Sequence, residues 1–133
     1  FVKMNVAKYI GIPYGAKGRT YEASDCFGLV YLFYRDTLGL NIPSYSTDYT
    51  HSEHRQSVAD AIIDNLPNWV KVDEPEYGDM LVFNILGLPI HTGIYLGCNN
   101  FLHSFMKTNS CIERLDSITW NRRLHGAYRW QKT

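Results

Sequence analysis

The sequence predicts one α+β domain, residues 1–133, in which helices pack on one side of an antiparallel sheet. Apolar residues follow a helical spacing in the first half of the chain, whereas the second half consists of short apolar runs separated by turn-forming residues. A length of 133 residues suits one domain, and we find no repeat or linker-like stretch. Helices followed by a meander of strands indicate an α+β fold rather than alternating parallel units.

Three helices are expected in the first half. A short helix over residues 4–9 is closed by a glycine and a proline, and a polar, glycine-containing loop over residues 14–23 follows it. The main helix begins after Ser24 or Asp25, either of which can cap it, and its crowded apolar residues are typical of a buried helix that ends at Gly39. After a polar loop, a helix over residues 57–66 ends at a proline.

Five strands are expected in the second half. Each is a short apolar run, and glycine, asparagine and serine separate the second run from the third and the third from the fourth. The runs are residues 80–85, 91–96, 100–105, 111–115 and 126–130.

The charge balance excludes several functions. Thirteen basic residues offset thirteen acidic ones, so the chain lacks the basic surface of a nucleic-acid-binding protein and the polybasic patch of a membrane-surface protein. No run approaches the roughly 18 apolar residues of a membrane span. The chain begins at Phe1 rather than at methionine, which is compatible with a piece of a longer chain.

Among the three cysteines, Cys26 has the position best suited to chemistry. It lies in the first turn of the main predicted helix, where unpaired amides and the helix dipole favour a thiolate, so we expect its pKa to fall. The same amides can stabilise an oxyanion. Cys98 lies in a turn and Cys111 at a strand edge, and neither has this help. Without a Cys-x-x-Cys pair, no structural zinc site is expected.

A nucleophilic cysteine needs a base, and His91 and His103 are the best candidates of five histidines because they flank one predicted hairpin. A three-residue loop over 97–99 would place His103 opposite Gly93, diagonal to His91 and on the same face of the sheet. His91 would then be the base and His103 would orient it. A two-residue loop would put the two rings on opposite faces, as two unrelated histidines. Spacing leaves both arrangements open.

Several segments together resemble the NlpC-type papain-like cysteine peptidases. Asp-Cys-Phe-Gly-Leu-Val at 25–30 resembles their nucleophile motif Asp-Cys-Ser-Gly-Leu-Val, and His-Thr-Gly-Ile-Tyr-Leu-Gly at 91–97 resembles their His-Val-Gly-Ile-Tyr-Leu-Gly. Residues 78–83 resemble their Gly-Asp-Leu-Val-Phe-Phe strand and residues 101–104 their Phe-Ile-His-Ala. Ile-Pro-Tyr at 12–14 matches the Pro-Tyr that carries an active-site tyrosine.

This resemblance implies a papain-like fold, with the nucleophile helix packed on an antiparallel sheet of five to six strands. It assigns Cys26 as the nucleophile, His91 as the general base and His103 as the residue that orients His91. Tyr14 and Asp25 are expected on the oxyanion and substrate-binding side. The implied substrate is a peptidoglycan stem peptide, cut between the γ-carboxyl of D-glutamate and a diamino acid, without a metal or cofactor.

Two departures affect the substrate pocket. Phe27 replaces the small residue that usually follows the nucleophile, and residues 18–24 lack the common Trp-Gly-Gly approach to the cysteine. Together with residues 34–45, the large residue resembles the branch found in tailed-phage tail-tip proteins. We therefore expect a virion protein with tail-tip partners, or a secreted, cell-wall-associated one. The alternatives are a structural tail-tip module with little or no catalysis, and an acyl transferase or amidase that uses the same thioester chemistry.

Overall fold

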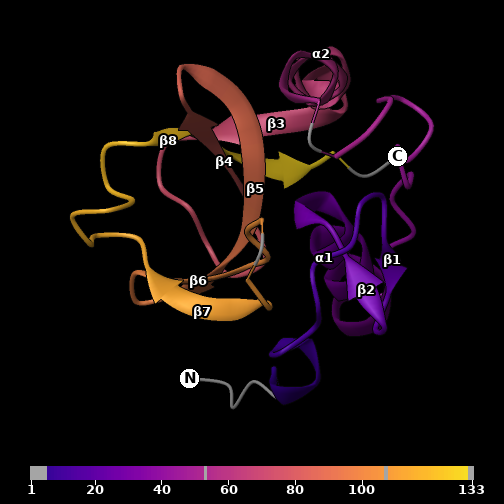
Figure 1. Ribbon diagram of the computed structural model, residues 1–133. Coiled ribbons are helices and arrows are strands. Elements are labelled where there is room, and N and C mark those ends of the chain that lie inside the picture. Colours follow the sequence, from indigo (N-terminus) through magenta and orange to yellow (C-terminus); the bar gives the residue numbers. More distant parts are fainter. Residues whose placement is uncertain (1–5, 53, 107, 132–133) are drawn as a thin grey trace.

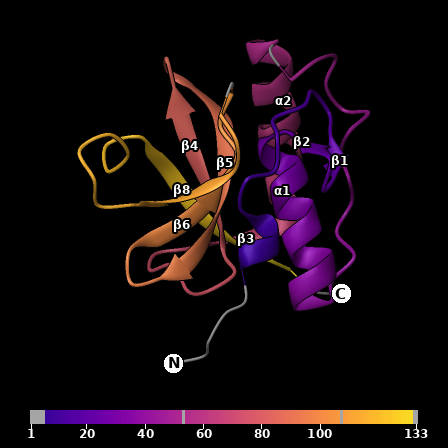
Figure 2. The same ribbon diagram turned by 60° about the horizontal axis from the view of Figure 1, so that its bottom comes forward.

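The protein has two layers, a curved six-stranded antiparallel sheet and two helices on one face of it (Figure 1). The computed structural model describes residues 6–52, 54–106 and 108–131. Figure 2 shows α1, Cys26–Phe33, and α2, Arg55–Asn65, on the same side of the sheet, with the connection before β8, Leu124–Trp130, on the other side. The predicted α+β class is therefore confirmed. Within the described residues, no helix is both long and apolar enough to cross a lipid bilayer.

Helix α1 begins where the sequence predicts, because Asp25 caps it. The Asp25 carboxylate accepts a hydrogen bond from the Gly28 backbone N–H at 2.8 Å. The helix continues as a π-helical segment over Tyr34–Leu38 and ends at Gly39, whose φ of 68° is the left-handed conformation that glycine adopts without strain. The apolar residues of α1 are buried almost all round, as their crowding predicts.

The remaining helical segments differ from the prediction, since the first is shorter and α2 starts two residues earlier. Only Ala7–Tyr9 forms a helical turn near the N-terminus, and residues 4 and 5 of the predicted helix lie outside the described residues. The stretch 14–23, expected as a loop, contains part of a small hairpin of β1, Arg19–Thr20, and β2, Ala23–Ser24. Helix α2 starts at Arg55, capped by the His54 ring, and passes into a turn over Leu66–Asn68.

All five predicted strands exist, and a sixth joins them at the edge. The strand order is β3-β8-β4-β5-β6-β7, and every neighbouring pair is antiparallel. Strand β3 was missed because its apolar run is only Trp69-Val70 before Lys71 interrupts it, and both Val70 and Lys71 are exposed. Apart from β8, already given, the strands are β3 Trp69–Val72, β4 Met80–Ile85, β5 Leu88–Gly97, β6 Asn100–His103 and β7 Cys111–Arg114.

The central strands are buried on both faces. Val82, Ile94 and Leu102 pack against α1. The alternate residues of these strands, such as Phe83 and Phe101, point away from α1. They form a second core with other side chains on the opposite face of the sheet. Two-sided burial explains why these strands read as continuous apolar runs rather than as alternating ones.

Gly28 is required by the close approach of the β1–β2 hairpin to α1. A Cβ built at Gly28 would lie 1.9 Å from the Gly18 carbonyl oxygen, which is a backbone atom and cannot rotate away. We expect Gly28→Ala to lower the free energy of unfolding by about 3 kcal/mol through overpacking. Gly87→Ala is the control, since its Cβ would meet open space and only its positive φ of 84° carries a cost of about 1 kcal/mol. Urea unfolding measures both, and equal losses would contradict the close approach.

Candidate active site

Cys26 lies at the N-terminus of α1 and faces strand β5. Its Sγ is 3.7 Å from the Ile90 carbonyl oxygen. Cys26 lines a pocket of about 230 Å³ together with Tyr14 and His91, and the pocket extends between α2 and the sheet. The structure thus brings four of the five predicted site residues, Asp25 included, to one cavity, with the thiol at a helix start, as the sequence indicates.

The surroundings of the Cys26 thiol oppose the effect of the helix terminus. Burial, followed by the Asp25 carboxylate, raises the pKa of the Cys26 thiol to about 11, although the neighbouring Thr92 and Arg19 act in the lowering direction. The expectation of a lowered thiol pKa is therefore wrong for this structure, because desolvation of Sγ outweighs the favourable dipole. A thiolate here needs a partner that takes the proton and stays beside it.

His91 and His103 lie on the same face of the sheet. His103 pairs with Gly93, diagonal to His91, as predicted. The hairpin reaches this register differently from the expected three-residue loop: Cys98 and Asn99 form a two-residue turn with positive φ, and a bulge at Leu96 adds one residue to β5. A two-residue turn alone would have placed His91 and His103 on opposite faces of the sheet. The extra residue of the bulge returns them to the same face.

A chain of hydrogen bonds links the two histidines to a carboxylate. His91 Nε2 lies 2.7 Å from His103 Nδ1, and His103 Nε2 lies 2.8 Å from Glu113 Oε2. Because a carboxylate can only accept, the His103 proton is on Nε2, and Nδ1 then accepts from the Nε2 proton of His91. This order leaves the lone pair of His91 on Nδ1, where it can accept a proton.

Glu113, which sets this order, is not among the site residues predicted from the sequence. Glu113 lies on β7 two residues beyond Cys111, which pairs with His103, so both point to the same face as the histidine. Its other oxygen accepts a hydrogen bond from Trp120 Nε1 at 3.1 Å. The available signal was the alternation from Cys111 to Glu113, but it becomes useful only when the β6–β7 register is known.

Aromatic rings enclose the His91 imidazole. The Phe105 and Trp120 ring centroids lie 4.9 and 5.4 Å from that of His91, and Trp120 is stacked on it. Burial, with smaller contributions from His103 and Arg123, holds the pKa of His91 well below its usual range. His91 is therefore neutral at pH 7 and available as a base. If His91 takes up a proton, the neighbouring aromatic rings stabilise the imidazolium that forms.

The described contacts of Cys26 and His91 do not include a hydrogen bond between them. The two side chains share the pocket, and Sγ interacts with the backbone of Ile90, the residue before His91. Catalytic hydrogen bonds are often long in the absence of substrate and shorten in the complex. Proton transfer between the two side chains therefore requires the Cys26 thiol to turn from the Ile90 carbonyl toward the His91 ring.

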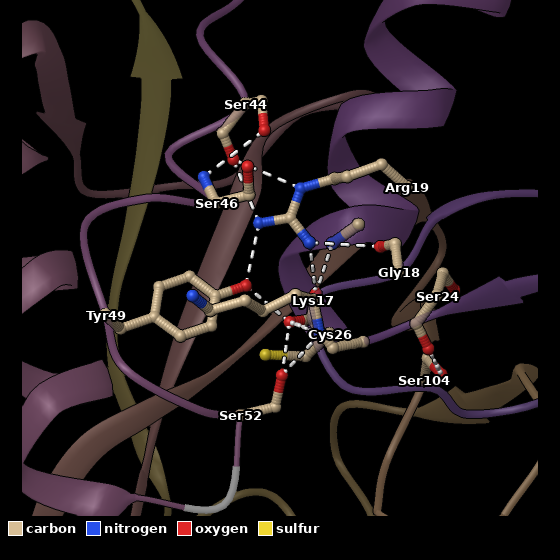
Figure 3. A network of polar contacts seen from close by, with 12 residues as sticks. Lys17, Gly18, Arg19, Ser24, Cys26, Ser44, Ser46, Tyr49, Ser52 and Ser104 are labelled. Atoms are coloured by element: carbon tan, nitrogen blue, oxygen red, sulfur yellow. Dashed lines mark hydrogen bonds and ion pairs between the residues drawn. The ribbon is translucent and has the colours of Figure 1, made fainter.

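Asp25 holds the segments around Cys26 together. Figure 3 shows the labelled side chains of Arg19, Tyr49 and Ser52 converging near the start of α1. The Asp25 carboxylate accepts from Arg19 Nη1 at 2.7 Å, from Ser52 Oγ at 2.7 Å, from the Lys17 backbone N–H at 3.1 Å and from the Tyr49 hydroxyl. Its side chain is 3% exposed. With its oxygens occupied, Asp25 is a positioning residue for the pocket, and its predicted contact with substrate stays a prediction.

Residues 11–129 match the NlpC/P60 family, and the chain belongs to this family. It is 28% identical over 123 residues to the murein DD-endopeptidase MepS/murein LD-carboxypeptidase of Escherichia coli (strain K12), covering 92% of this chain and 58% of that protein. It is 29% identical over 132 residues to the gamma-DL-glutamyl hydrolase of Bacillus subtilis (strain 168), covering 97% of this chain and 29% of the hydrolase. The chain thus spans just over half, or less, of these relatives.

Solved structures of the family have the same fold. A Staphylococcus aureus protein described as similar to a lipoprotein of the NLP/P60 family superposes with a TM-score of 0.66 at 27% identity, covering 96% of this chain and 39% of that one. An NlpC/P60 family protein from Bacillus cereus gives 0.65 at 22% identity, covering 93% and 37%. The predicted papain-like fold and the peptidase-type hydrolase class are confirmed at the level of the family.

Loss of the Asp25 carboxylate should destabilise the protein strongly. Asp25→Ala leaves the largely buried Arg19 guanidinium without its carboxylate and removes the shared acceptor of three segments. We expect a loss of about 3 kcal/mol in the free energy of unfolding. Asp36→Ala is the matched control, because the Arg35–Asp36 pair is exposed and worth at most about 1 kcal/mol. Urea denaturation of both variants measures the difference, and a small loss for Asp25→Ala would contradict its role as the organising group.

Proposed function

We propose that this domain is a cysteine endopeptidase that hydrolyses peptidoglycan stem peptides, between the γ-carboxyl of D-glutamate and a diamino acid. The observation that supports it most is the ordered chain from Glu113 through His103 to His91, beside a pocket that contains Cys26 at a helix N-terminus. The relatives named as murein endopeptidase and gamma-DL-glutamyl hydrolase point to the same substrate class.

In the first step, the Cys26 thiol passes its proton to His91 Nδ1 as Sγ attacks the amide carbonyl carbon. Burial disfavours a thiolate at Cys26 alone and an imidazolium at His91 alone. The two charges therefore form together, as a contact ion pair. The Cys26 backbone N–H, at the start of α1, and the Tyr14 hydroxyl stabilise the oxyanion. The imidazolium then gives its proton to the leaving amine, which departs as the tetrahedral intermediate collapses to a thioester.

In the second step, water attacks the thioester with His91 as the general base. His103 and Glu113 keep His91 Nε2 protonated throughout, so Nδ1 is the only nitrogen of that ring that gains and loses a proton. The products are a free carboxylate on the acyl side and the regenerated thiol.

The residues that line the pocket indicate which chemical groups of a substrate it can bind. Because Asp25 is neutralised by Arg19, Arg55 is the unneutralised charge that we assign to substrate binding among the described lining residues. An arginine suits the carboxylates of a γ-glutamyl or diamino acid residue. The other walls are mostly apolar, with Phe27 among them, and they fit the aliphatic parts of such a peptide.

We further propose that the domain acts at the bacterial cell wall, either on a virion tail tip with other tail proteins or as part of a secreted protein. The support is the resemblance of Phe27 and residues 34–45 to the tail-tip branch. A zero net charge provides no electrostatic attraction to an anionic wall, so a fused or assembled partner would supply the targeting.

Acyl transfer is the second candidate, and the apolar pocket favours it. A thioester shielded from water by apolar walls reacts with an amine that the pocket binds more readily than with bulk water. The products separate the two reactions, because hydrolysis leaves a carboxylate and transfer leaves a new amide. Mass spectrometry of muropeptide digests, with and without added amine acceptors, distinguishes them.

Replacing the nucleophile should abolish turnover. We expect Cys26→Ala to lower kcat on defined muropeptides by a factor on the order of 10⁶, to below detection, as loss of a nucleophile does in other covalent mechanisms. Cys98→Ala is the matched control, since Cys98 is exposed in the β5–β6 turn, and it should retain full activity. Equal cleavage by wild type and Cys26→Ala would refute the assignment, and an inactive wild type would favour a structural module.

Removing Glu113 should slow the reaction without weakening substrate binding. Without the carboxylate, His103 and His91 lose their fixed proton order, so we expect kcat of Glu113→Ala to fall about tenfold or more. The loss should not exceed the roughly 10²–10⁴-fold that a general base contributes as a whole. KM should change little, because Glu113 does not line the pocket.

Glu113→Gln, which keeps an acceptor oxygen, should recover most of the rate. Ile112→Thr, the neighbouring position on the opposite face, is the control. A rise in KM with unchanged kcat would contradict this role.

A further inference from the structure

Strands β6 and β7 place three metal-ligating side chains together at the edge of the sheet. His103 pairs directly with Cys111, and Glu113 follows on the same face of β7. The ligand atoms of these three residues all lie within 4.8 Å of one another. The site is separate from the pocket, since neither Cys111 nor Glu113 lines it.

The spacing of the three ligands suits a zinc ion. Tetrahedral zinc with bonds of about 2.0–2.3 Å holds its ligand atoms about 3.3–3.8 Å apart. The Cys111 Sγ to Glu113 Oε2 distance is 3.9 Å, and the 2.8 Å between Glu113 Oε2 and His103 Nε2 widens when zinc replaces the shared proton. The adjustment falls on the Glu113 side chain, which is 41% exposed.

The surroundings also suit a thiophilic divalent cation. Imidazole, thiolate and carboxylate together are ligands that zinc prefers, and water can complete a three-residue set. Trp120 Nε1 binds the other oxygen of Glu113 and orients the carboxylate, as outer groups do around metal ligands. His103 is buried whereas Cys111 and Glu113 are partly exposed on an edge strand, so an ion can enter from solvent.

We propose that His103, Cys111 and Glu113 form a zinc site that switches the enzyme off by reversing the proton order of the two histidines. Zinc on His103 Nε2 moves the proton of that ring to Nδ1. His103 Nδ1 then donates to His91 Nε2, so the single proton of His91 moves to Nδ1. Each ring keeps one proton, and the Cys111 thiol proton leaves to solvent.

The result is a His91 that presents a proton, rather than a lone pair, to the Cys26 thiol. His91 can no longer accept the proton of Sγ, and a second proton cannot enter at Nε2, because His103 Nδ1–H already points at it. Zinc therefore blocks the general base from outside the substrate pocket. This inhibition rests on the proposed function, whereas metal binding does not.

Metal binding is tested with cobalt, a spectroscopic substitute for zinc. The Cys26→Ala/Cys98→Ser protein retains Cys111 as its one thiol. We expect it to bind one Co²⁺ with a thiolate-to-cobalt charge-transfer band, displaced by Zn²⁺, and the band to vanish when Cys111→Ser is added. A folded double variant without the band would overturn the site. If the double variant does not fold, Cys98→Ser provides the same comparison with and without Cys111→Ser.

The proton order is tested by imidazole ¹⁵N NMR on the Cys26→Ala protein. Without metal, the protonated nitrogens of His91 and His103 should both be Nε2, and with zinc both should be Nδ1. Unchanged tautomers in the zinc-bound protein would overturn the switch.

Inhibition is tested by muropeptide cleavage with zinc and then with a chelator, each variant being compared with its own metal-free rate. Wild type and Cys98→Ser should lose activity and recover it. Cys111→Ser should need at least about 10- to 100-fold more zinc, because loss of even an outer partner of a metal ligand costs this much affinity. Equal sensitivity of Cys111→Ser would place the inhibitory zinc on Cys26 and His91 and overturn the switch. Cobalt bound through Cys111 in a protein without hydrolase activity would refute the proposed function and leave the metal site standing.

Discussion

The buried carboxylate of Asp25 is the constraint on which the architecture around the pocket depends. An ionised group this deep is tolerated only if donors surround it. The donors come from the start of α1, from the β1–β2 hairpin region and from the loop before α2, so satisfying one side chain fixes three segments relative to one another. The same requirement fixes the position of Cys26, the next residue. The carboxylate also raises the pKa of the Cys26 thiol, so the group that positions the nucleophile makes it harder to ionise.

The second organising feature is directional rather than electrostatic. Glu113 can only accept hydrogen bonds, so His103 donates to it and in turn accepts from His91. This fixed direction determines which nitrogen of His91 is basic. Each imidazole ring has two nitrogens and one proton. Changing the group bound to His103 Nε2 therefore changes which nitrogen of His91 holds the proton. This is the basis of the proposed zinc switch, in which a metal on His103 Nε2 removes the lone pair of His91 Nδ1 at the pocket.

The two features explain how an overall neutral domain can contain reactive chemistry. The balanced charge of the chain leaves no large field over the surface, and reactivity is confined to a few desolvated groups. Burial disfavours a separate thiolate at Cys26 and a separate imidazolium at His91, so in the proposed mechanism the two charges form together as a pair. The aromatic rings of Phe105 and Trp120 support the imidazolium in that pair.

The sequence by itself determined the elements that depend on local chemistry. It located α1 from its cap and its crowded apolar residues, and five of the six strands from their apolar runs. It also singled out Cys26, His91 and His103 as candidate site residues from position and motif. Even the diagonal placement of the two histidines was among its alternatives, although turn length alone could not choose between the parities.

Only the tertiary structure decided what depends on contacts between distant segments. The bulge at Leu96 set the parity, the pairing of β6 with β7 brought Glu113 to His103, and the placement of β3 beside β8 completed the sheet. Burial reversed the expected direction of the Cys26 pKa, because desolvation depends on everything packed around Sγ and not on its position in a helix. A local pattern fixes which side chains of one strand share a face, but register and burial are properties of the assembled fold.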